Sequence, residues 1–109
     1  MQIAVHNRRT DLAQALRIHV ERRLQVSLDR FRGLLGRGIV RVCPEGPKQI
    51  RCYISIEVNT LGQIAVEERD ADLFAVIDRA TGKLSRLVGR ELERRRGVRM
   101  SRESVRLVA

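Results

Sequence analysis

The fold is decided by residues 72–96, which read DLFAVIDRATGKLSRLVGRELERRR. Apolar residues recur there every three or four positions, as they do along one face of an α-helix. Cations recur at the same spacing on a neighbouring face. The apolar members are Leu73, Ile77, Ala80, Leu84 and Leu87, and the cationic members are Arg79, Lys83, Arg86 and Arg90, with Arg94 close by. The stretch predicts a long helix with one face toward a core and another face suited to anions.

Upstream of this helix, the sequence predicts one further helix and four strands. The first helix begins at an N-cap, Thr10 or Asp11, and ends in a glycine-rich segment at 33–38. Its apolar positions are Leu12, Leu16, Val20, Leu24, Phe31 and Leu35. Alternating apolar residues predict strands at 2–6, 39–43, 49–58 and around 64–66. The acidic residues Glu67, Glu68, Asp70 and Asp72 are interpreted as caps and dipole partners of the second helix.

This β-α-β-β-β-α order predicts an α+β fold. Each strand has one apolar face and each helix one apolar stripe, so a four-stranded mixed sheet with both helices on one face buries them all. The first two strands, joined through a helix, are expected to be parallel, and the others antiparallel. Residues 1–96 are expected to form a single domain and residues 97–109 a flexible C-terminal tail.

The composition favours a polyanionic partner. The chain has 109 residues, with 22 Lys and Arg against 13 Asp and Glu, which gives a net charge of +9 and a pI near 11.3. Nucleic acid is favoured over a membrane, because the chain lacks Trp and any long apolar run. Of its three aromatic residues, Phe31 and Phe74 are expected in the core and Tyr53 outside it. A cytoplasmic monomer is expected.

Nothing in the sequence indicates catalysis. Cys43 and Cys52 are expected to be buried or half-buried free thiols, and their spacing does not match a zinc site. His6 and His19 have no triad-like partners, and no phosphate loop or pair of catalytic carboxylates is present. We expect no enzyme activity, no metal, no cofactor and no small-molecule substrate.

A second row of cations is predicted on the first helix, where His19, Arg23 and Arg30 share one edge of the apolar face. If this row faces the cations of the second helix, the two rows line a groove of positive potential. The alternative is that the rows point apart and never meet a common ligand. The sequence leaves both arrangements open.

Gly82 and Gly89 lie within the second helix, seven residues apart and therefore on the same side. Each costs about 1 kcal/mol of helix stability relative to Ala. Either this side of the helix allows another surface to approach closely, or the glycines are simply tolerated.

Several segments resemble one known family. The segments are residues 15–24 (ALRIHVERRL), 72–78 (DLFAVID) and 83–86 (KLSR), followed by Arg90, together with the opening Met1-Gln2-Ile3. With the same element order, they make the first 95 residues or so similar to the ribosome hibernation-promoting factor and ribosome-associated inhibitor family, also called sigma-factor modulation proteins.

The resemblance implies a fold akin to a double-stranded-RNA-binding domain. It also implies binding to the small ribosomal subunit in the mRNA channel near the decoding site, where the protein blocks mRNA and tRNA, as in stress or stationary phase. Lys83, Arg86, Arg90 and Arg23 match the family's basic residues and would contact rRNA phosphates. The complete set of candidate rRNA-binding residues is His19, Arg23, Arg30, Arg79, Lys83, Arg86, Arg90 and Arg94.

The chain departs from the family pattern in several places. Family members often carry Lys where this chain has Val26 and Asp29, so Arg30 is the candidate substitute in the first helix. Leu87 stands where the family usually has Gln. The C-terminal domain with which longer members pair ribosomes is lacking, so the chain is not expected to pair ribosomes alone. The tail carries Arg99, Arg102 and Arg106, whereas some short members have an acidic tail.

Two alternatives to the ribosomal hypothesis stay open. One is an RNA-binding module that acts away from the ribosome. The other is a protein-interaction module that uses the open face of the sheet, with Arg41, Arg51, Tyr53, Ser55 and Glu57. An RNA-binding sheet face would need several stacking aromatic residues, and Tyr53 alone qualifies.

Overall fold

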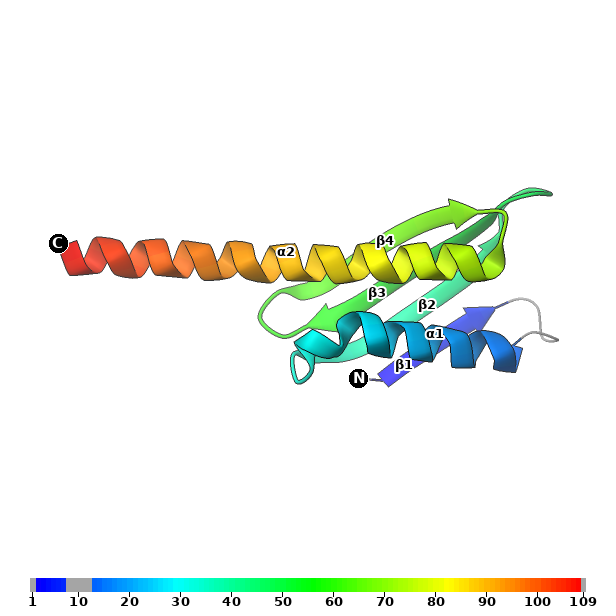
Figure 1. The fold of residues 1–109 in the computed structure, drawn as a ribbon, viewed down its shortest axis with the longest axis horizontal. Helices are drawn as coiled ribbons and strands as arrows, with labels where there is room; N and C mark the ends of the chain where they lie inside the picture. Colours follow the sequence, from blue (N-terminus) through cyan, green and yellow to red (C-terminus); the bar gives the residue numbers. More distant parts are fainter. Residues whose placement is uncertain (1, 8–12, 109) are drawn as a thin grey trace.

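The computed structural model describes the backbone of residues 2–7 and 13–108 and the side chains of residues 2–6 and 14–95. The elements follow the predicted order (Figure 1). They are β1 (Gln2–Asn7), α1 (Ala13–Leu28), a 3₁₀ turn η2 (Asp29–Phe31), β2 (Leu35–Pro44), β3 (Ile50–Val58), β4 (Gly62–Asp70) and α2 (Leu73–Val108). The predicted α+β class and the β-α-β-β-β-α order are confirmed.

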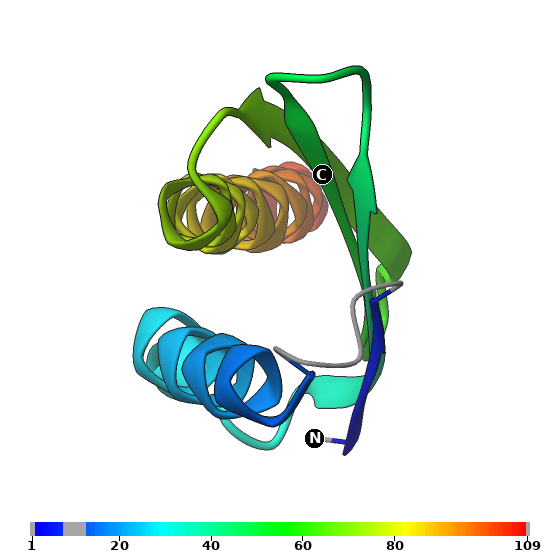
Figure 2. The ribbon, with the colours of Figure 1, turned by 90° about the vertical axis from the view of Figure 1, so that its right-hand side faces the viewer.

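The four strands form one mixed sheet in the order β1-β2-β3-β4. β1 and β2 are parallel, with Ala4 opposite Ile39, and the other neighbouring pairs are antiparallel. Figure 2 shows both helices on one face of this sheet, with the other face open. The predicted topology is therefore confirmed, and it leaves two surfaces for a partner: the helical side and the open sheet face.

The core lies between the helices and the sheet. Strand alternation places the apolar residues of β2, β3 and β4 under the helices and the polar residues on the open face. The buried apolar residues are Leu16, Val20, Leu24, Leu28 and Phe31 from α1 and η2; Val40, Val42, Cys52, Ile54, Ile56, Val58, Ile64 and Val66 from the sheet; and Val76, Ile77, Ala80, Leu84 and Val88 from α2. The predicted apolar stripe of α2 faces this core, with Leu73 and Leu87 partly buried at its margin.

The start of α2 is fixed by two aspartates. Asp72 is the N-cap, because its Oδ1 accepts a hydrogen bond of 3.0 Å from the backbone N–H of Ala75. Asp70 Oδ1 accepts from the N–H of Asp72, also at 3.0 Å. This bond, and then the guanidinium of Arg79, hold the pKa of Asp70 below its ordinary value of 3.8.

Two helix boundaries differ from those predicted. The first helix, α1, ends at Leu28 and η2 follows it to Phe31, because β2 already begins at Leu35 and includes Gly36 and Gly38. A Cβ at Gly36 would lie 3.0 Å from Cδ of the Glu57 side chain, which occupies the space beside this glycine. The predicted N-cap at Thr10 or Asp11, and Leu12, lie outside the described residues.

The second helix is longer than predicted. Its backbone continues through residues 97–108 and projects beyond the sheet (Figure 1), whereas the sequence predicted a loose segment after Arg96. A single glycine at position 97 costs about 1 kcal/mol and does not end a helix by itself. The division into a domain at 1–96 and a flexible tail stays a prediction.

Phe74 lies outside the core, and its predicted place inside the core is wrong. It is 42% exposed, and its ring meets the His19 ring edge-on at a centroid distance of 4.7 Å. The preceding residue, Leu73, packs against the core instead. Phe31 is buried as predicted.

Both cysteines are free thiols, as predicted, with Cys43 half-buried and Cys52 buried. Burial raises the pKa of the Cys52 thiol to about 12. None of the helices in the described part of the chain has the length and apolar character needed to cross a membrane.

Candidate nucleic-acid interface

The cations of α1 meet a carboxylate of α2. Asp78 Oδ1 lies 2.9 Å from His19 Nε2 and 3.1 Å from Arg23 Nε. The Arg23 contact lacks hydrogen-bond geometry, so it is an ion pair that leaves the buried Nε without a hydrogen-bond partner. Asp78 thus neutralises the middle of the first predicted row and draws α1 and α2 together.

Arg30 is held in place in η2, just after the end of α1. Its guanidinium carbon lies 4.5 Å from the centroid of the Phe31 ring, and its Nη2 donates to the carbonyl oxygen of Ser85 at 3.2 Å. Ser85 Oγ in turn donates to the carbonyl oxygen of Ser27 at 2.6 Å. Gly89 makes room for this arrangement, because a Cβ there would lie 2.8 Å from Arg30 Nη2. Of the two alternatives for the helix glycines, close approach of another surface therefore applies at Gly89, whereas at Gly82 a Cβ would meet only Arg86 Nη1, at an ordinary 3.5 Å.

The first cations of α2 turn toward β4 and away from α1. Arg79 pairs with Asp70 at 3.1 Å and with Glu68 at 3.7 Å. Lys83 lies 3.5 Å from Glu68 and donates to the carbonyl oxygen of Glu67 at 3.4 Å. The sequence interprets the acidic residues before α2 as caps and dipole partners. This interpretation holds for Asp70 and Asp72, but Glu68 is an ion-pair partner of Arg79 and Lys83.

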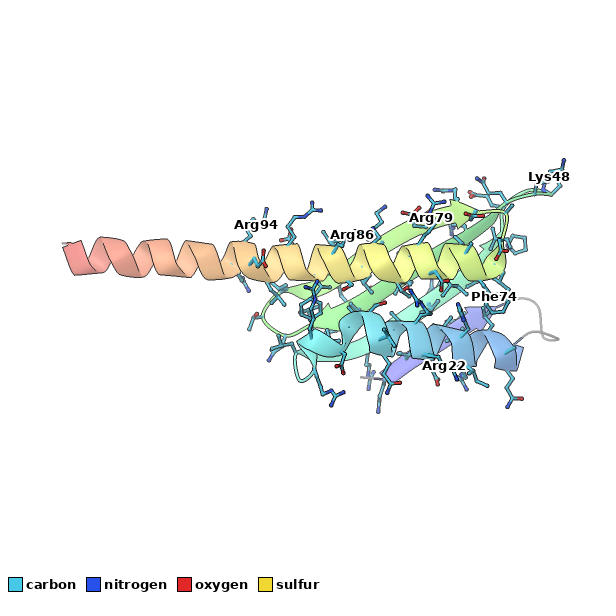
Figure 3. The ribbon with its side chains drawn as sticks, viewed as in Figure 1. Arg22, Lys48, Phe74, Arg79, Arg86 and Arg94 are labelled. Carbon is cyan, nitrogen blue, oxygen red and sulfur yellow. The ribbon has the colours of Figure 1, made fainter. Side chains whose placement is uncertain are left out.

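The two cationic rows therefore do not face each other across a common groove. Figure 3 shows Arg79, Arg86 and Arg94 along the edge of α2 that lies away from α1. The row of α1 faces α2, where Asp78 and Ser85 meet it. The alternative in which the rows point apart is the one that the structure supports.

Arg86 and Arg90 are the candidate residues left open for an anion. Both are exposed, and neither makes an ion pair within 4.0 Å among the residues whose side chains are described. They lie four residues apart, or about 6 Å along the helix axis. Arg94, the next member of the row, is paired with Glu91 at 2.8 Å.

Sequence reasoning missed the carboxylates that hold the other candidates. Asp78 belongs to the quoted family segment 72–78, but nothing in the local pattern indicates that it contacts His19 and Arg23, 59 and 55 positions earlier in the chain. Arg22 on α1 and Arg95 on α2 are further exposed cations that the predicted set of rRNA-binding residues does not include.

The open sheet face is partly neutralised. Arg69 pairs with Glu67 at 2.7 Å and with Glu45, and Arg51 lies 3.6 Å from Glu67. The hydrogen bond from Arg69 is the main reason why the pKa of Glu45 lies below its ordinary value. Tyr53 on this face is only half-exposed. The face keeps the exposed cations Arg37 and Arg41, which make no ion pair among the described side chains, but it offers less stacking surface than an RNA-binding sheet requires.

The comparisons with known proteins identify a sequence family and a fold. The sequence family described as sigma 54 modulation protein / S30EA ribosomal protein matches residues 3–96. The chain is similar to the N-terminal domain of Thermus thermophilus Protein Y, with 33% identity and a TM-score of 0.69 over 83% of this chain and 98% of that domain.

A second solved structure shares the fold. It is a ribosomal subunit interface protein from Coxiella burnetii, with 14% identity and a TM-score of 0.70 over 85% of this chain and 99% of the other. A search of curated protein sequences returned no match.

Proposed function

We propose that this chain, which belongs to the sigma 54 modulation protein / S30EA ribosomal protein family of ribosome-associated proteins, binds the small ribosomal subunit in the mRNA channel near the decoding site and blocks mRNA and tRNA. The observation that carries the proposal is that Arg86 and Arg90, within the segment of α2 that resembles the family, are exposed and make no ion pair among the residues with described side chains. They lie on the helical side.

The physical basis is phosphate binding. Each phosphate that a cation neutralises releases condensed counterions, which makes binding favourable and strongly dependent on salt. Arg86 and Arg90 are well suited, because a guanidinium can form two parallel hydrogen bonds to one phosphate. Such contacts position the protein on rRNA without reading its sequence. The net charge of +9 adds long-range attraction.

Inhibition in this proposal needs no chemistry. A domain of this size in the mRNA channel excludes mRNA and the anticodon ends of tRNA by occupying their space. The degree of inhibition then depends on the affinity and concentration of the protein rather than on turnover.

Co-sedimentation with ribosomes tests the proposal. The wild-type protein should travel with the small subunit, and the variant Lys83→Glu/Arg86→Glu/Arg90→Glu should stay at the top of the gradient. Arg37→Glu/Arg41→Glu/Lys48→Glu is the matched control, because it changes the net charge equally at exposed positions on the sheet and its loop. Loss of binding in the control alone would move the interface to the sheet face.

Competition tests the location. A fluorescently labelled mRNA oligonucleotide bound to small subunits should be released by the wild-type protein and retained with the α2 variant. If the protein binds the subunit and the oligonucleotide also stays bound, the site lies outside the channel. Binding that is insensitive to salt would instead favour a protein partner.

A further inference from the structure

A pocket of about 490 Å³ opens where α2 leaves the sheet. Its walls come from the end of α1, the β3–β4 turn and α2, and they include Arg30, Phe31, Leu34, Thr60, Gly89 and Glu93. Apolar and aromatic walls with a few polar groups are typical of sites for small planar ligands, and the volume falls in their usual range.

The most ordered polar group in this wall is the guanidinium of Arg30. Its guanidinium carbon lies over the Phe31 ring, 4.5 Å from the centroid, and its Nη2 donates a hydrogen bond to Ser85 O. The plane is thus fixed before any ligand arrives. A guanidinium held in this way is a flat platform, and unstacked RNA bases stack on such planes as they do on aromatic rings.

Gly89 leaves the space that the Arg30 guanidinium occupies. With any larger residue, a Cβ would lie 2.8 Å from Arg30 Nη2 and 3.4 Å from Phe31 Cζ. The far end of the Arg30 side chain would have to move. Gly82, one heptad earlier, differs, because a Cβ there would meet only Arg86 Nη1 at 3.5 Å, an ordinary contact.

The pocket and the open cations lie along the same stretch of α2. Gly89 directly precedes Arg90, and Glu93 follows it within one turn of α2. An RNA strand whose phosphates are held by Arg86 and Arg90 would follow the same turns of α2 that supply one wall of the pocket. Inside it, the Glu93 carboxylate can accept hydrogen bonds from N–H groups on a base edge.

We propose that this pocket takes one unstacked rRNA base, which stacks on the Arg30 guanidinium. The inference rests on the proposed function and adds a contact to it: Arg30, which the sequence predicted as a phosphate-binding cation, acts as a stacking platform. Phosphate contacts at Arg86 and Arg90 set the salt dependence of binding, whereas the base in the pocket adds affinity that is largely independent of salt.

The first test replaces glycines. Gly89→Ala should displace the Arg30 guanidinium without changing any charge, and Ala suits a helix better than Gly. We expect it to weaken binding to purified small ribosomal subunits by about tenfold, with the slope of log affinity against log salt unchanged. Gly82→Ala, the matched control in the same helix, should bind as the wild type does.

The second test keeps the positive charge at residue 30 and removes the planar guanidinium. Arg30→Lys should weaken binding by a similar factor, because an ammonium offers no flat face for a base. If Arg30 serves only as a cation for phosphate, this variant should bind like the wild type, and the stacking proposal is then wrong. Thermal unfolding of each variant shows whether its fold is retained.

The outcomes separate the two proposals. If Lys83→Glu/Arg86→Glu/Arg90→Glu abolishes binding while Gly89→Ala and Arg30→Lys bind like the wild type, the base pocket is refuted and the ribosomal function stands. If the triple variant also binds like the wild type, the proposed function itself fails. If Gly89→Ala weakens binding but Arg30→Lys does not, the platform is refuted.

Discussion

Two consecutive parts of α2 carry the same chemistry in sequence but differ in the structure. Arg79 and Lys83 form what we call the paired half, since Asp70 and Glu68 bind them. Arg86 and Arg90 form the open half, with no acidic partner among the described side chains. Both pairs are cations four residues apart on an exposed face. The difference shows that the availability of a cation to a ligand is set by the neighbouring element.

The neighbouring element is β4. It leads directly into α2, so its last residues lie beside the first turns of the helix, and those residues are acidic. Its earlier residues, such as Gln63 and Ala65, carry no charge. The order of charges along one strand therefore divides a uniform cationic row into a neutralised part and a part that can bind phosphate.

The largest expected effect is the loss of binding when the open half is removed. Arg86→Ala/Arg90→Ala should weaken binding to small subunits by roughly 100-fold, since each charge-assisted phosphate contact is worth about tenfold. Arg79→Ala/Lys83→Ala removes the same charge from the paired half and should weaken it less than about threefold, because those cations are already bound. Equal losses in a filter-binding titration would show that carboxylate pairing does not decide availability.

Binding should become somewhat tighter when a cation of the paired half is released from its carboxylate. Glu68 contacts both Arg79 and Lys83. Glu68→Gln keeps its shape and removes its charge, so Lys83 becomes free while Asp70 still holds Arg79. We expect binding to tighten by about two- to fivefold at low salt, with one more phosphate contact in the salt slope.

Glu57→Gln is the control for this charge change. Glu57 is exposed on the open sheet face, and it makes no ion pair among the residues with described side chains. It should tighten binding only through the change in net charge. If Glu68→Gln and Glu57→Gln tighten binding equally, the release of Lys83 adds no phosphate contact. Pairing with Glu68 then does not explain the difference between the two halves.

The fold could be predicted because several independent patterns agreed. Alternation in β3 placed Ile54 and Ile56 under the helices, and the 3.6-residue period of α2 placed Ile77 and Leu84 against them. Phe74 was misplaced because periodicity alone does not say which of two adjacent apolar residues, Leu73 or Phe74, turns inward. That choice depends on how α2 sits against α1, where His19 receives the Phe74 ring.

The candidate site could be predicted only as a list of cations. Their residue type and helical spacing are visible in the sequence, and Arg86 and Arg90 are among them. The partners are not, because Glu68 meets Lys83, and Asp78 meets Arg23, only after the strands and helices have packed. The flat Arg30 platform was missed for the same reason, since it depends on Ser85 and Gly89 from another element.

The smallest expected effect is on stability in acid, and it tests whether the paired half is paired in solution. The native pKa of Asp70 lies below 3.8, first because of the Asp72 N–H and then because of Arg79. Since the unfolded state binds the proton at higher pH, this stabilisation is complete above about pH 4 and is lost as pH falls through the native pKa.

Thermal unfolding between pH 3 and 6 measures the stabilisation that the lowered pKa of Asp70 provides. Asp70→Asn should show a shallower fall in Tm below about pH 4 than the wild type. Glu45 has a lowered pKa on the open sheet face, mainly through Arg69, so Glu45→Gln gives the corresponding comparison there. Arg79→Ala should reproduce only part of the Asp70→Asn change, because the Asp72 N–H still lowers the Asp70 pKa. If Arg79→Ala leaves the acid limb unchanged, Arg79 is not held by Asp70 in solution. Glu68, 3.7 Å from Arg79 and 3.5 Å from Lys83, would then be the carboxylate that defines the paired half.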